Sequence, residues 1–271
     1  MAFSISVLTS ITTMLALVGV CVLIEMLVPR DHYPLTGRRL GAAFQVAQVG
    51  VAAFVAYPLG QLYIYLGLRP LLPSIDQWAG VFAIPFALLA VDFLRYWEHR
   101  FEHRFMWPVH VVHHSPEELH AANAYGHPLQ AVPMFFLIAL PFSLLNFQSA
   151  ATPVFVGLIV TFMGYFIHSS ADFHLGPLRV IFVDNRYHRI HHSLEPRHFD
   201  HNFGIVFTLW DRLFGTEHFP SVDEWPEVGV EGSPPPKSIG QFLAMPFRGD
   251  TRAAAAESNA VEAQEATLQA P

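Results

Sequence analysis

The chain has 271 residues, of which 52% are hydrophobic and 14% are charged, and its mean hydropathy is +0.35. This balance is typical of an integral membrane protein, and the formal net charge of −7 comes with no basic stripe of the kind that binds nucleic acid. The single cysteine, Cys21, lies in an apolar run, which excludes a disulfide framework within one chain, a cysteine-ligated iron–sulfur cluster and a CxxCH haem site.

The first two apolar runs predict two membrane-spanning helices. Residues 5–28 are long enough to cross a hydrocarbon core about 30 Å thick. They lack the basic start and the cleavage site of a signal peptide. A second span is expected at 43–66. The link between the two carries Arg30, Arg38 and Arg39, so the positive-inside rule places it on the cytoplasmic face.

A third span, at about 79–97, is expected to return the chain to the cytoplasmic face and to continue directly into a histidine-rich stretch. Asp92 lies seven residues before His99, on the same side of the helix. Ionisable groups this close to hydrocarbon need partners. Asp92 is therefore expected to accept the free N–H of a metal-binding histidine, to pair with Arg95, or to reach toward the interface at the end of the span.

The fourth apolar region, 131–167, contains two short runs, 131–147 and 153–167. They predict a tight hairpin of two thin or tilted spans, or a re-entrant pair. In either arrangement the chain returns to the membrane face from which the hairpin starts. Residues 1–248 are expected to form a single domain, and the Ala/Glu/Gln-rich residues 249–271 a disordered tail.

Two histidine clusters lie on either side of this hairpin. Side chains three or four residues apart share one face of a helix, so each cluster offers several imidazoles in one direction. A lone histidine is usually a surface or core residue, but eight at helical spacing predict a metal site, and their number favours two ions. Imidazole suits zinc, copper, iron and nickel, so the ligand type leaves the metal open. The eight are His99, His103, His110, His113, His114, His188, His191 and His192.

Four stretches resemble the sterol desaturase and fatty acid hydroxylase superfamily of membrane di-iron oxygenases. They are HRFEH, HVVHHSPEELHAANAYGHPLQ, FIHSSADFHLGPLRVIFVDNRYHRIHHS and HNFGIVFTLWDRLFGT, within about residues 79–218. The resemblance implies an all-α integral membrane protein with about four transmembrane helices in two hairpins. A cytosolic, histidine-rich helical cap would hold two irons facing a hydrophobic substrate tunnel.

The resemblance also implies which residues bind the metals. The eight clustered histidines would be ligands, and His168 a ninth. His127, in GHPLQ, would be either a ligand or a neighbour of one. His174 follows His168 by six residues, a spacing that does not stack on a helix, so it would at most touch a ligand. Asp184 precedes the last histidine motif and would position it or contact a redox partner.

Other residues near the motifs are expected to have structural roles. Asn202, Gly204, Trp210, Asp211 and Gly215 resemble a superfamily signature that would pack under the metal-binding cap. For His120, His198 and His201 we expect surface or structural roles, and for His32 and His218 no function.

The activity implied by the resemblance is O2-dependent oxidation of an unactivated C–H bond in a fatty acyl, sterol or other isoprenoid lipid. Hydroxylation is preferred over desaturation, and no catalytic residue beyond the metal ligands is expected. The chain has no GxGxxG nucleotide motif, so electrons would come from an external ferredoxin or cytochrome b5-type reductase system.

An alternative of another class is a membrane protein that transports or binds divalent metals. Such a protein should place its ligands near the bilayer midplane. Here the clusters begin beyond the ends of the spans. This position disfavours the transporter. No dilysine-type or KDEL-type ending suggests the endoplasmic reticulum, so the preferred location is a bacterial cytoplasmic membrane, with the site on the cytoplasmic face given by the Arg-rich link.

Overall fold

The computed structural model describes residues 2–71, 74–75, 79–221 and 223–248, and the predicted tail, 249–271, lies outside them. Within the described ranges the chain is helical, with isolated β-bridges and no strand. Three segments are long and apolar enough to cross a membrane: Phe3–Leu27, Leu35–Tyr65 and Gly80–Phe105. The expected all-helical membrane architecture is therefore confirmed.

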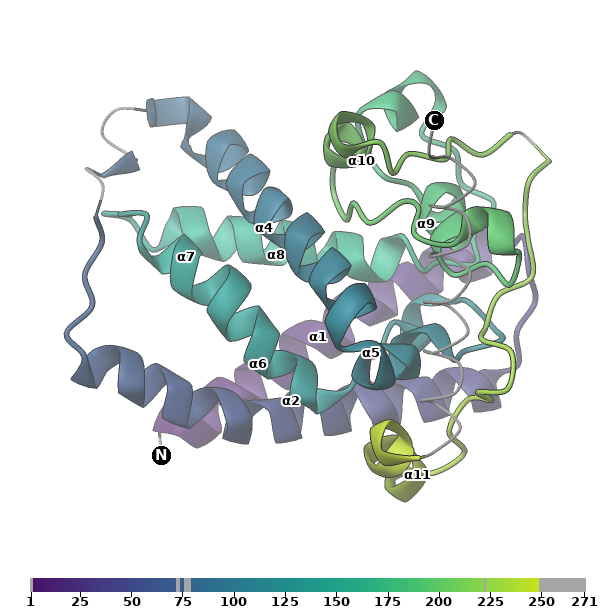
Figure 1. Cartoon of the computed structure of the whole chain (residues 1–271), viewed down its shortest axis with the longest axis horizontal. Helices are drawn as coiled ribbons and strands as arrows, with labels where there is room; N and C mark the ends of the chain where they lie inside the picture. Colours follow the sequence, from purple (N-terminus) through teal and green to yellow (C-terminus); the bar gives the residue numbers. More distant parts are fainter. Residues whose placement is uncertain (1, 72–73, 76–78, 222, 249–271) are drawn as a thin grey trace, which may run out of the picture.

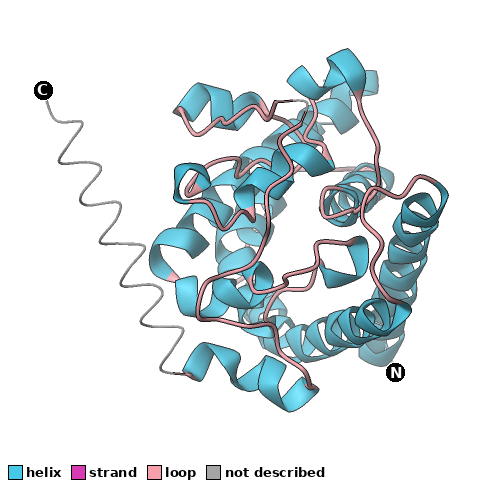
Figure 2. Ribbon diagram, turned by 90° about the vertical axis from the view of Figure 1, so that its right-hand side faces the viewer, coloured by secondary structure: helices cyan, strands magenta, loops and turns pink. Residues whose placement is uncertain are grey.

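The long helices run side by side, and the short helices gather at one end of them (Figure 1). The long ones are α1 (Ala2–Leu27), α2 (Leu35–Tyr65), α4 (Ala83–Phe105) and the shorter α8 (Ala151–Phe166). The cap contains α5 (Trp107–His114), α9 (Asn185–His191), α10 (Leu209–Phe214) and α11 (Ile239–Ala244). In Figure 2, which views the molecule from the cap, the short helices and loops lie in front of the long helices.

The second span begins earlier than predicted, because α2 starts at Leu35 and not near residue 43. Arg38, expected in a loop, lies buried in the first turns of α2, where it pairs with the buried Glu25 of α1. Glu25 also accepts the backbone N–H groups of Ala121 and Ser170, at 2.8 and 3.1 Å. A buried charge is stable only when it is paired and hydrogen-bonded. The ion pair allows α2 to include the buried Arg38. The two backbone hydrogen bonds to Glu25 attach the cap to α1.

The predicted hairpin consists of α8 and a segmented first arm. This arm contains α6 (Ala131–Met134), a π-helical turn (Phe135–Ala139) and α7 (Leu140–Ser143). Pro141 has no N–H to donate to Leu137, which removes an α-helical hydrogen bond and favours a wider turn at this point. The π-helical turn lines the apolar groove described below.

Gly41 of α2 lies against the cap, with no space for a side chain. A Cβ there would lie 2.2 Å from Asn123 Oδ1 and 2.4 Å from the Ala122 carbonyl oxygen. We expect Gly41→Ala to destabilise the fold by about 1–3 kcal/mol, because backbone must shift to accept the methyl group. Gly50→Ala on the same helix is the control, since nothing lies within 4 Å of its Cβ position. Equal melting temperatures of the two variants in detergent would contradict this prediction.

Candidate metal centre

The first five histidines of the motifs come from two consecutive helices. His99 and His103 occupy the last two turns of α4, one turn apart on the same face. The chain turns at Met106, and Pro108 favours the start of α5 because a proline needs no hydrogen-bond acceptor in a first turn. α5 then presents His110, His113 and His114 back toward the end of α4.

The last motif lies on α9, a helix of seven residues that is too short to be stable alone. Asp184 caps it by accepting the N–H of Tyr187 at 2.9 Å. Asn185 donates from its side-chain amide to the carbonyl groups of Ser169 and Ala171, at 2.9 and 2.7 Å. These contacts hold α9 against the segment that follows α8, and Asp184 thus has the positioning role that was one of the two expected for it.

The nine histidines expected as ligands lie in two adjacent groups at the cap end of the molecule. The five-histidine group contains His99, His103, His110, His114 and His191. The four-histidine group contains His113, His168, His188 and His192. Within each group, neighbouring Nε2 atoms lie 3.1–3.2 Å apart. The groups touch where the rings of His114 and His192 stack at 4.3 Å.

The protonation of these rings makes each group fit a cation. His113 Nδ1 lies 3.0 Å from the Tyr125 carbonyl oxygen, and His168 Nδ1 lies 2.6 Å from that of Gly164. Each ring must donate an Nδ1 proton there. Burial lowers the pKa of His113 to about 4 and that of His168 well below its usual value, so both rings are neutral. Two unprotonated Nε2 atoms therefore face each other at 3.2 Å, an arrangement that a metal ion stabilises.

The five-histidine group is oriented in the same way. His99 Nδ1 bonds the Phe203 carbonyl at 3.0 Å, and His191 Nδ1 bonds the His201 carbonyl at 2.8 Å. His110 differs, because its Nδ1 lies 2.7 Å from a carboxylate oxygen of Glu102. Outer contacts of this kind fix the ring orientation and raise the basicity of the ligand atom.

Two residues at this site were missed in the sequence. Glu102 and Gln130 are buried, and the amide of Gln130 bonds both Glu102 Oε2, at 2.6 Å, and His110 Nδ1, at 3.0 Å. The signal for Glu102 was a carboxylate next to His103 at the end of an apolar span, where an unpaired charge is costly. Gln130 gave no such signal, because the contact spans 28 residues.

We expect Glu102→Gln to weaken metal binding by the five-histidine group about 10–100-fold, the usual effect of losing an outer carboxylate partner. Metal affinity can be measured by competition with a chelator. Glu195→Gln is the control, since this exposed carboxylate bonds Arg197 and no clustered histidine. Unchanged affinity in Glu102→Gln would show that the contact with His110 does not tune the site.

A cavity of about 250 Å³ borders both histidine groups. Its wall includes His99 and His110 from one group, and His113 and His168 from the other. Beyond it, an apolar groove of about 580 Å³ lies between α1, α2 and the arm that contains the π-helical turn. Gln48 and Met134 line both spaces, so the groove adjoins the cavity.

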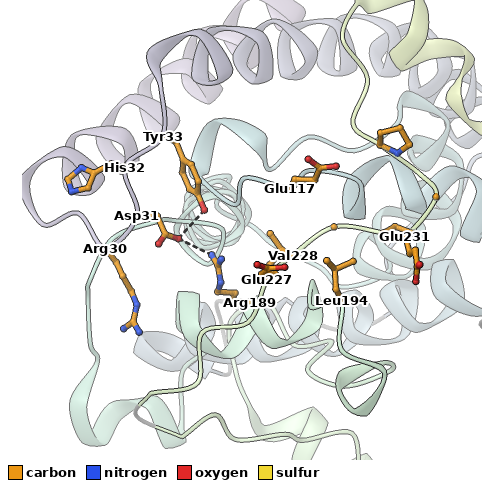
Figure 3. Close-up of a pocket in the computed structure, with 14 residues that line it drawn as sticks. Arg30, Asp31, His32, Tyr33, Glu117, Arg189, Leu194, Glu227, Val228 and Glu231 are labelled. Carbon is orange, nitrogen blue, oxygen red and sulfur yellow. Dashed lines mark hydrogen bonds and ion pairs between the residues drawn. The ribbon is translucent and has the colours of Figure 1, made fainter.

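A larger cavity, of about 920 Å³, lies elsewhere in the cap (Figure 3). Its labelled residues include Arg30, Glu117 and Arg189, with Arg189 hydrogen-bonded to Asp31 at 3.3 Å. No clustered histidine lines it. We therefore place the metal chemistry at the smaller cavity.

Residues 84–216 match a family model described as fatty acid hydroxylase. The chain is 34% identical to an ornithine lipid hydroxylase from Rhizobium tropici over 176 residues, 64% of this chain and 52% of that protein. It is 32% identical to human alkylglycerol monooxygenase over 133 residues, 48% of this chain and 29% of that protein. No solved structure matches the chain. The chain belongs to the sterol desaturase and fatty acid hydroxylase superfamily.

This superfamily member spans about half the length of the ornithine lipid hydroxylase and less than a third of the alkylglycerol monooxygenases. A very-long-chain aldehyde decarbonylase from Arabidopsis thaliana is 28% identical over 170 residues, 57% of this chain and 27% of that protein. All nine histidines of the two groups lie inside the matched residues 84–216.

Asp92 is buried and has other partners than those expected for it. Its carboxylate accepts the backbone N–H groups of Val206 and Phe207, at 2.9 and 3.0 Å, and the indole N–H of Trp210 at 3.1 Å. No hydrogen bond or ion pair found among the described residues joins it to a histidine or to Arg95. Three donors, two from the loop at 206–207 and one from Trp210 of α10, satisfy a buried carboxylate better than a single imidazole N–H would.

His127 and His174 lie outside both histidine groups, which argues against a ligand role for His127. His127 accepts the N–H of Leu129 at 3.2 Å with one ring nitrogen, and its other nitrogen bonds the Leu243 carbonyl at 3.3 Å. Backbone groups are thus the hydrogen-bond partners of both ring nitrogens. His174 is exposed and lies 3.0 Å from a guanidinium nitrogen of Arg186, because the chain leads it away from the site after His168.

The C-terminal signature is hydrogen-bonded to a segment that touches the five-histidine group. Asp211 accepts the N–H groups of Phe203 and Gly204, both at 2.8 Å, and the hydroxyl of Thr216 at 2.7 Å. Because the Phe203 carbonyl bonds His99, this network fixes a ring of the five-histidine group.

Proposed function

We propose that the chain is a membrane di-iron oxygenase that hydroxylates an unactivated C–H bond of a lipid-like substrate. The observation that carries the proposal is the pair of histidine groups bordering one cavity that adjoins an apolar groove. An acyl or isoprenoid chain fits such a groove, and the carbon to be oxidised would lie in the cavity. The family match and the names of the relatives, hydroxylases and monooxygenases of lipids, support the reaction class.

The proposed iron ligands are the nine histidines, five for one ion and four for the other. Imidazole binds several metals, but zinc has no redox chemistry, so an oxygenase requires a metal such as iron. Bound iron, with O2 and electrons from a separate donor, supplies the oxidising power to break a C–H bond and insert oxygen.

The residues of the chain supply position and environment. Glu102 and the backbone carbonyl groups hold the rings so that their Nε2 atoms converge. The apolar groove would align the substrate chain, and Gln48 and Met134 border its passage into the cavity. Burial of the histidines excludes bulk water from the reacting atoms.

The proposed electron donor is an external ferredoxin or cytochrome b5-type reductase system, because a single cysteine cannot hold an iron–sulfur cluster. We place the cap on the cytoplasmic face, in a bacterial cytoplasmic membrane. Arg30 between α1 and α2 and Arg104 at the end of α4 lie at the cap end, as the positive-inside rule requires.

The test uses the full chain in mild detergent, loaded with iron and supplied with a chemical reductant, isotopically labelled O2 and a panel of lipids. A product that carries one labelled oxygen atom establishes hydroxylation. A product two hydrogens lighter without label would establish desaturation instead. Metal-dependent ion flux in vesicles without O2 consumption would overturn the oxygenase and favour a transporter.

The groove gives a more specific prediction. Ala53 of α2 lines it, and Ala53→Trp would fill the space where the substrate chain is proposed to lie. We expect kcat/KM for a long-chain lipid to fall on the order of 10²-fold, as displacement of a substrate by about 1 Å can cause, with iron content unchanged. Val51→Trp, at an exposed position outside the groove, is the matched control. Equal kcat/KM values for the two variants would show that the substrate does not lie in the groove.

A further inference from the structure

Three side chains outside both histidine groups form another cluster of the residue types that bind metal ions. His198, His218 and Glu224, here the outer cluster, place one ligand atom each within 4.8 Å of one another. His198 ends a short 3₁₀ turn (Pro196–His198), His218 follows α10, and Glu224 lies in the loop beyond. None of the three takes part in the proposed oxidation.

The ligand atoms are spaced as a small metal ion requires. Glu224 Oε1 lies 3.1 Å from His198 Nε2 and 3.2 Å from His218 Nε2. A tetrahedral ion with bonds of 2.0–2.2 Å separates its ligand atoms by about 3.3–3.6 Å, slightly more than these distances. The spacing also equals the 3.1–3.2 Å between Nε2 atoms in the two histidine groups.

The side chain of His198 and the backbone of His218 are each held in place by a further contact. His198 is fully buried, and its Nδ1 lies 2.9 Å from Ser193 Oγ. The backbone N–H and carbonyl of His218 both bond the side-chain amide of Asn202, at 2.8 Å each. Partners of this kind orient metal ligands before an ion arrives.

The carboxylate is available as a charged ligand. Glu224 is half-buried, and its Oε2 accepts the Ser221 N–H at 3.0 Å, which leaves Oε1 facing the two imidazoles. Arg197 competes for the same Oε1 from 3.2 Å, yet its side chain is 62% exposed and also bonds Glu195. It can therefore turn toward solvent when a cation takes its place.

We propose that the outer cluster binds a third divalent metal ion of the zinc type. His198 Nε2, His218 Nε2 and Glu224 Oε1 are its ligands, and water completes the shell, a two-histidine, one-carboxylate set that zinc accepts. The ion ties the loop around Glu224 to the cap. That loop bonds α9 directly, since Arg189 Nε donates to the Pro226 carbonyl at 2.8 Å.

The test counts zinc ions in the full chain in detergent, after all metals are removed and zinc alone is returned. We expect three zinc ions per chain, two in the histidine groups and one in the outer cluster. His218→Ala should lower zinc affinity at the third site about 10²-fold, the share of a single ligand in a structural zinc site. His201→Ala is the matched control, since its ring lies 6.0 Å from that of His218 and outside the cluster.

Arg197→Gln tests the proposal without removing a ligand. Loss of the competing guanidinium should raise zinc affinity at the third site several-fold, whereas a purely hydrogen-bonded cluster would show no change in zinc binding. Two zinc ions per chain in the unmodified protein, or a third ion indifferent to both His218→Ala and Arg197→Gln, would overturn the proposal. The zinc count does not depend on oxygenase activity, so failure of the proposed function would be seen separately.

Discussion

His113→Ala is expected to remove the metal ion of the four-histidine group and to abolish measurable turnover. Four-ligand sites bind zinc with apparent free energies of about 10–16 kcal/mol, or about 2.5–4 kcal/mol per ligand. Loss of one ligand should therefore weaken binding about 10²–10³-fold. The four-histidine group has no spare ligand, whereas the same change in the five-histidine group leaves four. Metal content per chain and O2 consumption measure the effect.

The control for this variant is His32→Ala, which removes an exposed histidine from the large cavity of the cap. It should keep both ions and full turnover. His103→Ala is the comparison within the site, and it should lose less metal than His113→Ala does. If His113→Ala kept two irons and normal O2 consumption, the proposed ligand set would be wrong.

Asp92→Ala is expected to destabilise the whole fold. The substitution leaves without an acceptor three donors that point at the buried carboxylate: the N–H of buried Val206, and the N–H of Phe207 and the indole of Trp210, which are half-buried. An orphaned buried group costs about 1–3 kcal/mol, so the loss should be at least about 3 kcal/mol. For a chain of this size the melting temperature should fall by about 6 °C or more. Thermal unfolding in detergent measures it.

Trp210→Phe separates the donors in this network. It removes the indole N–H and leaves the two backbone donors bonded to Asp92, so its effect should be about a third of that of Asp92→Ala. The same loop carries Phe203, whose carbonyl orients His99, and metal should therefore also be lost more readily from Asp92→Ala. Equal stability of Asp92→Ala and the unmodified chain would show that this contact does not hold the loop.

The limits of sequence-based prediction are clearest in residues with several possible partners. Asp92, His127 and Arg38 were noticed for their type and position, but their partners lie 114, 116 and 13 residues away along the chain. Periodicity gives the direction of a side chain on its own helix and not the surface that packs against it. Each of these three residues therefore required the tertiary structure for its role.

The sequence by itself determined the helices and the motifs. Long apolar runs and histidine spacings of three and four residues reflect the geometry of a single helix. They can therefore be recognised from the sequence. Tertiary structure alone decided how nine imidazoles divide into five and four. That division depends on contacts between distant segments, such as those of His103 with His191, 88 residues apart, and of His113 with His168, 55 residues apart. The same holds for the cavity and the groove, because helices that are remote in sequence form their walls.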